Sequence, residues 1–171
     1  MYKKIPSKRY KHTLDFLQKN VPAPATILDL GVRNPFSEIM EAHGYKVINT
    51  NGEDLDEVPE IVKKHKVDAV TALEILEHLV APLSVLKAVE ANKLIATIPM
   101  RLWFASAYRS KTDPWDRHYH EFEDWQFDWL VEKSGFKIKD RSKWTSPIKK
   151  LGIRPILRMF TPRYYAIYAE K

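Results

Sequence analysis

Residues 27–31, Ile-Leu-Asp-Leu-Gly, constrain the fold most, because they join an apolar strand to an Asp-x-Gly turn. In a doubly wound α/β sheet, a glycine after the first strand lets the backbone approach a ligand without a Cβ in the way. The following helix directs its N-terminus at the same place. The segment therefore predicts the first loop of a nucleotide-type cofactor site, with Asp29 and Gly31 at its centre.

Strand and helix patterns alternate downstream of this loop. Short strands are expected at residues 26–30, 45–49, 67–72 and 93–98, and helices at 10–17, 35–43, 58–66 and 83–90. Residues 137–140 and 164–169 are expected to close the sheet as an antiparallel pair. The order predicts an α/β fold, a Rossmann-like doubly wound and mostly parallel sheet with helices on both faces and an antiparallel C-terminal edge strand.

A resemblance to a known family rests on two segments. Residues 67–79, Val-Asp-Ala-Val-Thr-Ala-Leu-Glu-Ile-Leu-Glu-His-Leu, are followed by Ala81-Pro82, and residues 120–136 run from His-Glu-Phe to a Gly-Phe pair. The first segment resembles the fourth strand and its continuation, and the second the late helix, of the class I S-adenosylmethionine-dependent methyltransferases. The similarity extends roughly over residues 26–135 and is closest to the small single-domain, methyltransferase type 11/type 23-like branch that includes quinone-biosynthesis enzymes.

This resemblance implies S-adenosylmethionine as the cofactor and methyl transfer by in-line attack on the S-methyl carbon. Asp29 would orient the methionine amine, Asn51 would lie at the ribose, and Glu74 would lie along the methionine arm. The residues implied to bind the cofactor are Asp29, Gly31, Val32, Arg33, Asn51, Glu53, Asp54, Leu73 and Glu74. They all follow strands whose carboxyl ends meet at one edge of the sheet, where doubly wound folds bind ligands.

The chain departs from the family pattern at three points. Arg33 and Pro35 stand where the second and third glycines of the first loop would fall, and Asn51 stands where an acid usually holds the ribose. Residues 51–68 are also few for a helix, a third strand and a turn, so we expect that strand to be vestigial or absent. These departures favour an alternative function, that of a catalytically inactive binding or regulatory protein with a methyltransferase fold.

Residues 100–121 are expected to form a lid that contacts a small substrate, because long loops in compact domains are usually functional. The aromatic, charged and imidazole side chains of this segment are Arg101, Trp103, Phe104, Tyr108, Arg109, Trp115, Asp116, Arg117, His118, Tyr119 and His120. Trp103 or Tyr108 could face an aromatic substrate or the sulfonium. Arginines 101, 109 and 117 could hold a carboxylate or phosphate.

The candidate catalytic residues are His118, His120 and Tyr108, with a histidine as general base for an oxygen or nitrogen nucleophile. The run His118-x-His120-Glu121 also resembles metal-ligand spacing, but cysteine is absent and no third spaced ligand is evident, so we expect no metal. The adjacent pair Glu77-His78 is expected to fix its loop by packing and hydrogen bonding.

Positive charge is concentrated near the two ends of the chain. The net charge is +6, residues 1–12 contain five Lys or Arg and no acid, and residues 137–163 contain nine against Asp140 alone. A solvated face is the simplest interpretation, but nucleic acid or an anionic membrane surface are alternative partners. The residues that would contact nucleic acid are six cations and one tryptophan: Lys143, Trp144, Lys149, Lys150, Arg154, Arg158 and Arg163.

A membrane contact would use residues 147–160, whose apolar members alternate with cations. These apolar residues are Ile148, Leu151, Ile156, Leu157 and Phe160. We expect instead that the segment covers the last strands, because apolar residues between Lys and Arg stems usually pack on their own domain.

Length and composition fit one domain over residues 1–171, because 44% hydrophobic residues can fill a single core. Within it we expect an N-terminal helix in residues 1–20, the lid at 100–121 and a basic cover segment at 141–163. No signal peptide or membrane-spanning run is visible, and the absence of cysteine is compatible with a reducing compartment, so a cytoplasmic location is expected. The sequence gives no indication of oligomeric state or of the methyl acceptor.

Overall fold

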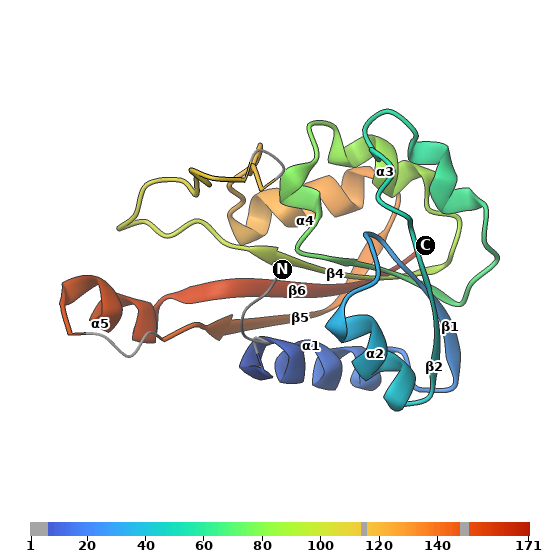
Figure 1. Ribbon diagram of the computed structural model, residues 1–171, viewed down its shortest axis with the longest axis horizontal. Helices are drawn as coiled ribbons and strands as arrows, with labels where there is room; N and C mark the ends of the chain where they lie inside the picture. The colour runs from blue at the N-terminus through green and yellow to red at the C-terminus, as the bar shows by residue number, and fades with distance from the viewer. Residues whose placement is uncertain (1–6, 114–115, 148–150) are drawn as a thin grey trace.

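The computed structural model describes residues 7–113, 116–147 and 151–171, and it has a six-stranded mixed sheet between two layers of helices (Figure 1). Four of the residues interpreted from the sequence lie outside these ranges, namely Trp115, Ile148, Lys149 and Lys150. The strands are β1 Ala25–Asp29, β2 Tyr45–Asn49, β3 Ala69–Leu73, β4 Lys93–Pro99, β5 Lys137–Thr145 and β6 Pro162–Glu170. The helices are α1 Ser7–Asn20, α2 Pro35–Ala42, η1 Pro59–Lys63, η2 Leu76–His78, α3 Pro82–Ala88, α4 Asp124–Lys133 and α5 Ile153–Phe160.

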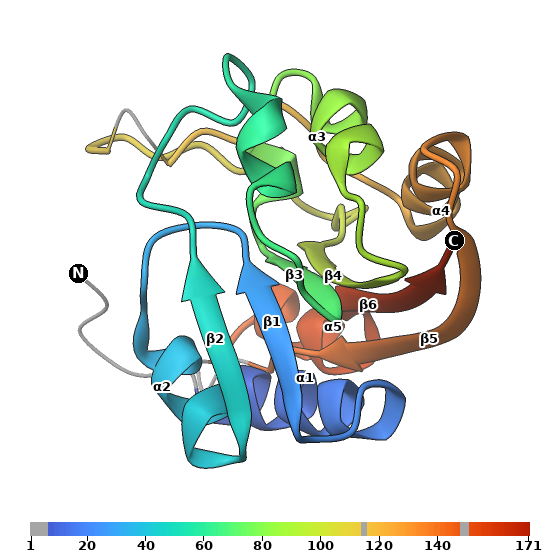
Figure 2. The same ribbon diagram turned by 90° about the vertical axis from the view of Figure 1, so that its right-hand side faces the viewer.

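The strand order is β2-β1-β3-β4-β6-β5, with β1 to β4 parallel and β6 antiparallel to both of its neighbours. This arrangement confirms the predicted fold class. The C-terminal strand β6 is inserted between β4 and β5, so β5 forms the edge and the two make the expected antiparallel pair. Residues 51–68 contain the short helix η1 and no strand, which leaves β2 at the opposite edge (Figure 2).

Helices cover both faces of the sheet, as expected. On one face, α1 and α2 bury Leu17 and Met40 against Ile27 of β1, and on the other, α3 and α4 bury residues such as Leu86 and Phe127 (Figure 1). The parallel strands β1 and β3 are therefore apolar along nearly their whole length, as strands covered on both faces must be.

Local signals fix where α2 begins. Asn34 accepts a hydrogen bond from the Phe36 amide at 2.8 Å, and the Asn34 amide donates to Ser37 Oγ at 3.3 Å. Pro35 occupies the first turn, where its missing N–H costs no helical hydrogen bond. This reciprocal cap holds the start of α2 beside the carboxyl end of β1.

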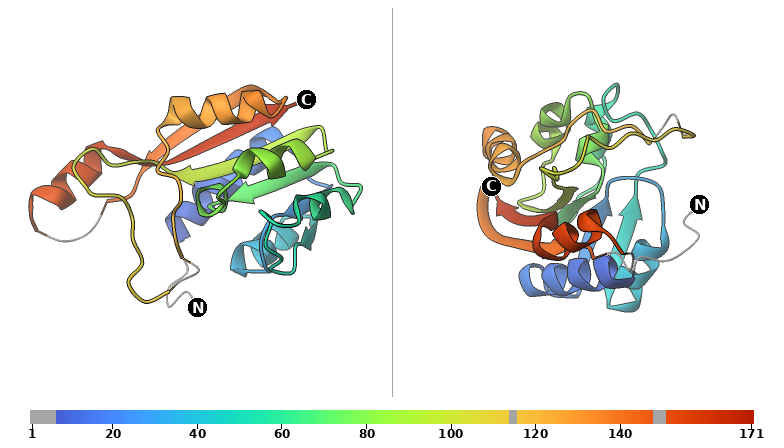
Figure 3. Two further views of the ribbon diagram at one scale, coloured as in Figure 1. Left: turned by 90° about the horizontal axis from the view of Figure 1, so that it is seen from above. Right: turned by 90° about the vertical axis from the view of Figure 1, so that its left-hand side faces the viewer.

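Two segments project from one end of the molecule, the loop at 100–121 and the helix α5 (Figures 1 and 3). The loop is tied to η2, because the Tyr119 and His120 amides donate to the Glu77 carbonyl at 2.8 and 3.2 Å. Helix α5 contacts β5 and β6, but none of its residues is buried, and the expected cover over the last strands stays a prediction. Among the described residues, none of the helices has the length and apolar character needed to cross a bilayer.

Candidate cofactor and acceptor site

Asp29 is the centre of a hydrogen-bonded group at the carboxyl ends of β1, β2 and β3. The sheet register pairs Asp29 with Asn49 and with Thr71, so the three side chains share one position along the strands. Asp29 Oδ1 accepts from Thr71 Oγ1 at 2.7 Å, and Asp29 Oδ2 accepts from Asn49 Nδ2 at 3.0 Å and from Ser37 Oγ at 3.5 Å. Burial raises the pKa of Asp29 to about 6, although these donors oppose the shift.

Gly31 forms the tight part of the first loop. Its φ of +116° lies in the region that side chains disfavour, so the glycine is required by backbone conformation. Its amide donates to Thr50 Oγ1 at 2.7 Å, and its carbonyl accepts from Asn49 Nδ2 at 3.3 Å. The loop is therefore fixed by side chains of β2 and the residue after it.

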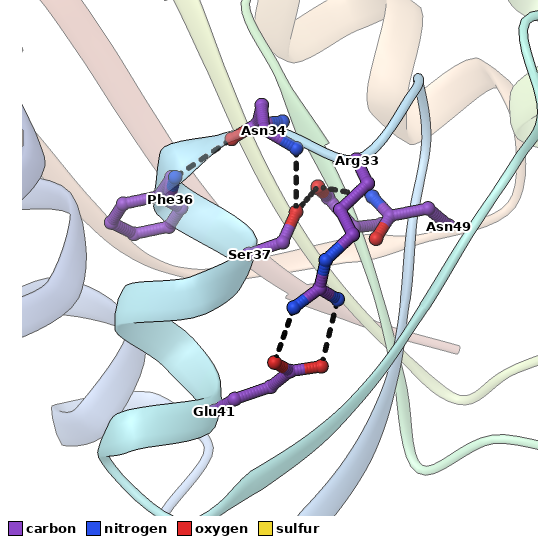
Figure 4. Close-up of polar contacts among 7 residues, drawn as sticks. Arg33, Asn34, Phe36, Ser37, Glu41 and Asn49 are labelled. Carbon is purple, nitrogen blue, oxygen red and sulfur yellow. Dashed lines mark hydrogen bonds and ion pairs between the residues drawn. The ribbon is translucent and has the colours of Figure 1, made fainter.

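Four of the residues implied to bind the cofactor form local contacts on the loops around the strand ends. Arg33 forms a two-point ion pair with Glu41 of α2, at 2.9 and 2.5 Å, along the outside of the helix (Figure 4). Asn51 is exposed, and its amide donates to Glu53 Oε2 at 2.6 Å. Asp54 is exposed and accepts from the Asp56 amide at 3.0 Å. These four side chains, those of Arg33, Asn51, Glu53 and Asp54, line neither of the two cavities described next.

A cavity of about 180 Å³ opens beside Asp29. Four predicted residues line it, Asp29, Val32, Leu73 and Glu74. Helix α1 adds three that the sequence did not indicate, Arg9, Tyr10 and Thr13. The local sequence does not predict these three residues, because the contact between α1 and the strand ends depends on tertiary packing.

A larger cavity of about 760 Å³ adjoins the first and shares Arg9, Val32 and Glu74 with it. Two candidate catalytic residues line this cavity, Tyr108 and His118. His120 does not line it, because its Nε2 lies 3.2 Å from the Val80 carbonyl and its ring stacks on Phe122. Other lining residues include Glu77, His78, Asp116 and Arg163.

The described tryptophan and the three arginines that the sequence predicted for the lid line neither cavity. Trp103 is exposed and meets Phe104 edge to face. Arg101 pairs with Glu123 at 3.8 Å, and Arg109 and Arg117 are exposed. In their place, the cations of the larger cavity are Arg9 and Arg163, which come from α1 and β6.

Two glutamates line the larger cavity, and one of them, Glu74, also lines the smaller. Glu74 adopts a positive φ of 54° at the end of β3, and its Oε2 pairs with Arg9 Nη1 at 3.4 Å. Glu77 is 1% exposed. Glu74 Oε1 and Glu77 Oε2 are buried without a hydrogen-bond partner among the described residues. Burial raises the pKa of both, and the charge of Glu74 adds to the shift that places the pKa of Glu77 well above its usual range.

Two histidines complete this corner. The rings of His78 and His118 meet edge to face at 4.7 Å, and His78 Nδ1 lies 2.9 Å from the Arg117 carbonyl. Burial, and then the neighbouring His78, lower the pKa of His118. Glu77, His78 and His118 each offer a possible metal-ligand atom, all within 4.8 Å of one another. This set differs from the His118, His120 and Glu121 run considered from the sequence, and the expectation of no metal stays a prediction.

Tyr108 is held by acids of the lid. Its hydroxyl donates to Asp116 Oδ2, which raises the pKa of Tyr108, and its amide donates to Glu121 Oε1 at 2.7 Å. Its ring lies 4.5 Å from that of His118. The phenol therefore remains protonated at neutral pH.

Comparisons with solved structures match nearly the whole chain at low identity. A SAM-dependent methyltransferase from Archaeoglobus fulgidus has a TM-score of 0.61 and 16% identity, over 95% of this chain and 94% of that one. An S-adenosylmethionine-dependent methyltransferase from Mesorhizobium loti has a TM-score of 0.57 and 12% identity, over 94% and 96%. The N-terminal domain of EvdMO1 with SAH bound has a TM-score of 0.51 and 13% identity, over 94% and 79%.

Two other comparisons gave nothing. No protein-family model and no curated protein matches the sequence. At these identities the structural matches show the fold alone. That fold agrees with the strand order and with cavities at the carboxyl edge of the sheet. The chain therefore has the fold of the class I S-adenosylmethionine-dependent methyltransferases.

Proposed function

We propose that this protein is an S-adenosylmethionine-dependent methyltransferase for a small acceptor that carries an anionic or aromatic group. The observation that supports it most is the pair of adjoining cavities at the carboxyl edge of the sheet, which meet at Glu74. One is lined by the strand-end acid Asp29, and the other by a histidine with a lowered pKa, His118. This order matches a cofactor site that opens onto an acceptor site.

The smaller cavity fits the methionyl end of the cofactor. Asp29 and Glu74 provide carboxylates for its ammonium group, and Arg9 provides a guanidinium for its carboxylate. A volume of about 180 Å³ is below the roughly 300–1,000 Å³ of most small-molecule sites. The cofactor would therefore extend past Glu74 into the larger cavity or displace the Arg9–Glu74 contact.

When bound, the cofactor supplies a methyl group activated by its sulfonium. The protein's contribution is then mainly positioning and exclusion of water, which can supply roughly 7–11 kcal/mol. His118 is suited to accept a proton from an acceptor hydroxyl or amine, because its lowered pKa keeps it neutral at physiological pH. Arg9 and Arg163 would attract an anionic acceptor, and the Tyr108 ring lies beside the same histidine.

A second use of His118 is favoured by one observation. The buried Glu77 Oε2 has no partner among the described residues, and a cation bound to Glu77, His78 and His118 would compensate it. The carbonyl of Arg117 at His78 Nδ1 leaves His78 Nε2 available for such a cation. His118 cannot accept a proton and bind a cation through the same nitrogen, so the two uses can be separated by experiment.

Thermal unfolding with S-adenosylhomocysteine tests the cofactor site. Ligand at about a hundred times its dissociation constant stabilises by about 2.7 kcal/mol, which raises Tm by about 5–10 °C in a chain of this size. We expect Glu74→Gln to remove most of this rise and Glu38→Gln, an exposed acid of α2, to keep it. No rise in the parent protein would contradict the proposal.

The alternative, an inactive binding or regulatory protein, is favoured by the outward positions of Arg33 and Asn51. A screen of small acids and phenols for release of S-adenosylhomocysteine distinguishes the two. Cofactor binding without turnover of any acceptor, and without methylation of the protein itself, would support the alternative.

A further inference from the structure

Helix α5 has an apolar face that is largely exposed among the described residues. Ile153 is 78% exposed, Phe160 is 77% exposed, and Leu151 just before the helix is fully exposed. Ile156 and Met159 are also more than half exposed, and no residue of the helix is buried. Burying such side chains in an apolar medium is favourable, so the face is suited to a partner outside the domain.

The apolar and the basic residues of α5 lie on different sides of the helix. Ile153, Ile156, Leu157 and Phe160 follow the spacing i, i+3, i+4, i+7 and so form one stripe, which we call the α5 apolar face. Arg154 and Arg158 lie on the other side of the helix at 100° per residue. This division, with Met159 at the margin of the stripe, is typical of helices that lie in a membrane interface.

The charge around α5 is of one sign. Residues 141–163 contain seven Lys or Arg and no acid. Arg141 and Lys143 are paired with Asp128 and Asp124 of α4. No salt bridge is described for Arg154, Arg158 or Arg163; Arg154 is exposed, Arg158 is half-buried, and Arg163 donates to the Met100 carbonyl at 2.5 Å. An anionic surface complements these arginines, whereas nucleic acid would leave the α5 apolar face in water.

The position of α5 connects this face to the larger cavity. The helix lies at the end of the molecule from which the 100–121 loop also projects (Figures 1 and 3). Arg163 and Tyr164, which follow α5 by three and four residues, line the larger cavity. A surface that binds α5 would therefore lie close to the cavity proposed to receive the acceptor.

We propose that α5 docks this protein on an anionic lipid bilayer, with its apolar face in the acyl–headgroup boundary and its arginines among the lipid phosphates. Residues 151–163 form the contact. Docking does not require the cofactor, but its consequence, that the acceptor is reached at the membrane surface, rests on the proposed function.

Co-sedimentation with vesicles tests this proposal. We expect the protein to sediment with vesicles of phosphatidylglycerol and phosphatidylcholine, and weakly with phosphatidylcholine alone, with binding that falls as salt is raised. The double variant Ile153→Glu/Phe160→Glu should lower the partition coefficient by more than about tenfold, because both side chains would carry charge into the acyl boundary. Arg154→Gln should lower it by about fivefold at low salt.

The matched control is Val80→Glu/Trp129→Glu, which adds the same two charges at apolar residues that are 60% and 65% exposed elsewhere on the surface. It should retain most of the binding. Thermal unfolding with S-adenosylhomocysteine should give the same shift in the parent and in the α5 variant, so loss of docking is distinct from loss of the cofactor site. Because α5 buries no residue, its variants should fold.

Three results would overturn the proposal. The first is no sedimentation with anionic vesicles. The second is equal binding of the α5 variant and the matched control to anionic vesicles, or equal binding of the parent protein to anionic and neutral vesicles. The third is a dimer in sedimentation velocity that Ile153→Glu/Phe160→Glu dissociates, because the α5 apolar face would then be covered by a second copy of the chain.

Discussion

Two buried acids lie along the same edge of the sheet, but their surroundings differ. Asp29 accepts hydrogen bonds from Thr71, Asn49 and Ser37, so its carboxylate is built into the fold. Glu77 is just as buried, yet one of its oxygens has no partner among the described residues. The first acid holds three elements together, whereas the second leaves an uncompensated group beside a cavity, which is costly unless a ligand or proton satisfies it.

The largest effect on the rate of methyl transfer is expected for His118, which lies beside Glu77 and His78 in the larger cavity. His118→Ala should lower the rate of methyl transfer by about 10²–10⁴-fold, whether His118 accepts the proton or holds a cation. S-adenosylhomocysteine affinity should fall much less than the rate, because His118 does not line the smaller cavity proposed to hold the methionyl end. The rate is measured by release of S-adenosylhomocysteine with an acceptor from the screen. His65→Ala, at an exposed position, is the control and should keep the parent rate.

The Asp29 group should show a pH dependence of stability. Its pKa is raised from 3.8 to about 6 in the folded protein, so between these values the folded state binds more protons than the unfolded state. The contribution of Asp29 to the free energy of unfolding of the ligand-free protein should therefore fall by up to about 3 kcal/mol as pH rises from about 4 to about 6, and should not change further above that.

Urea denaturation across this pH range measures the effect in the parent and in Asp29→Asn. The fall should be smaller in the variant, and Asp15→Asn, at an exposed acid of α1, should follow the parent. Identical pH profiles for parent and Asp29→Asn would show that burial does not raise the pKa of Asp29.

A divalent cation tests whether the Glu77 corner is open to a ligand. Mn²⁺ or Zn²⁺ at about a hundred times its dissociation constant should raise Tm by about 5–10 °C, because the cation would compensate the unpartnered Glu77 oxygen. Glu77→Gln should abolish the rise, whereas Glu57→Gln, at an exposed acid, should not. If the parent shows no rise, His118 is free to act as the base and the expectation of no metal is supported.

The sequence predicted the strands that form this edge of the sheet better than the side-chain contacts made there. The alternation of strands and helices placed β2 at the observed residues 45–49 and brought Asp29, Leu73 and Glu74 to one cavity. Such predictions succeed because the parallel strands are apolar on both faces and their carboxyl ends meet at one edge.

Contacts between distant segments were not predictable. Arg9 reaches Glu74 across 65 residues of chain, and the His78 and His118 rings are brought together only by the path of the 100–121 loop. The exposure of α5 was also missed, because an amphipathic pattern is the same for a helix that packs on its own sheet and for one that faces another partner. Arg33 was predicted to bind the cofactor because of its place in the first loop. Its side chain instead forms a local ion pair with Glu41.

The smallest effect is expected at that ion pair, and it tests whether the outer side of the first loop takes part in the cofactor site. Arg33 and Glu41 are both well exposed, so solvent screens the pair and its loss should leave the free energy of unfolding nearly unchanged. Arg33→Ala should leave the shift in Tm produced by S-adenosylhomocysteine unchanged, as should Glu41→Ala. A loss of that shift in Arg33→Ala alone would mean that the guanidinium leaves Glu41 to meet the cofactor, and that the first loop rearranges on binding more than the hydrogen bonds of Asp29 and Gly31 indicate.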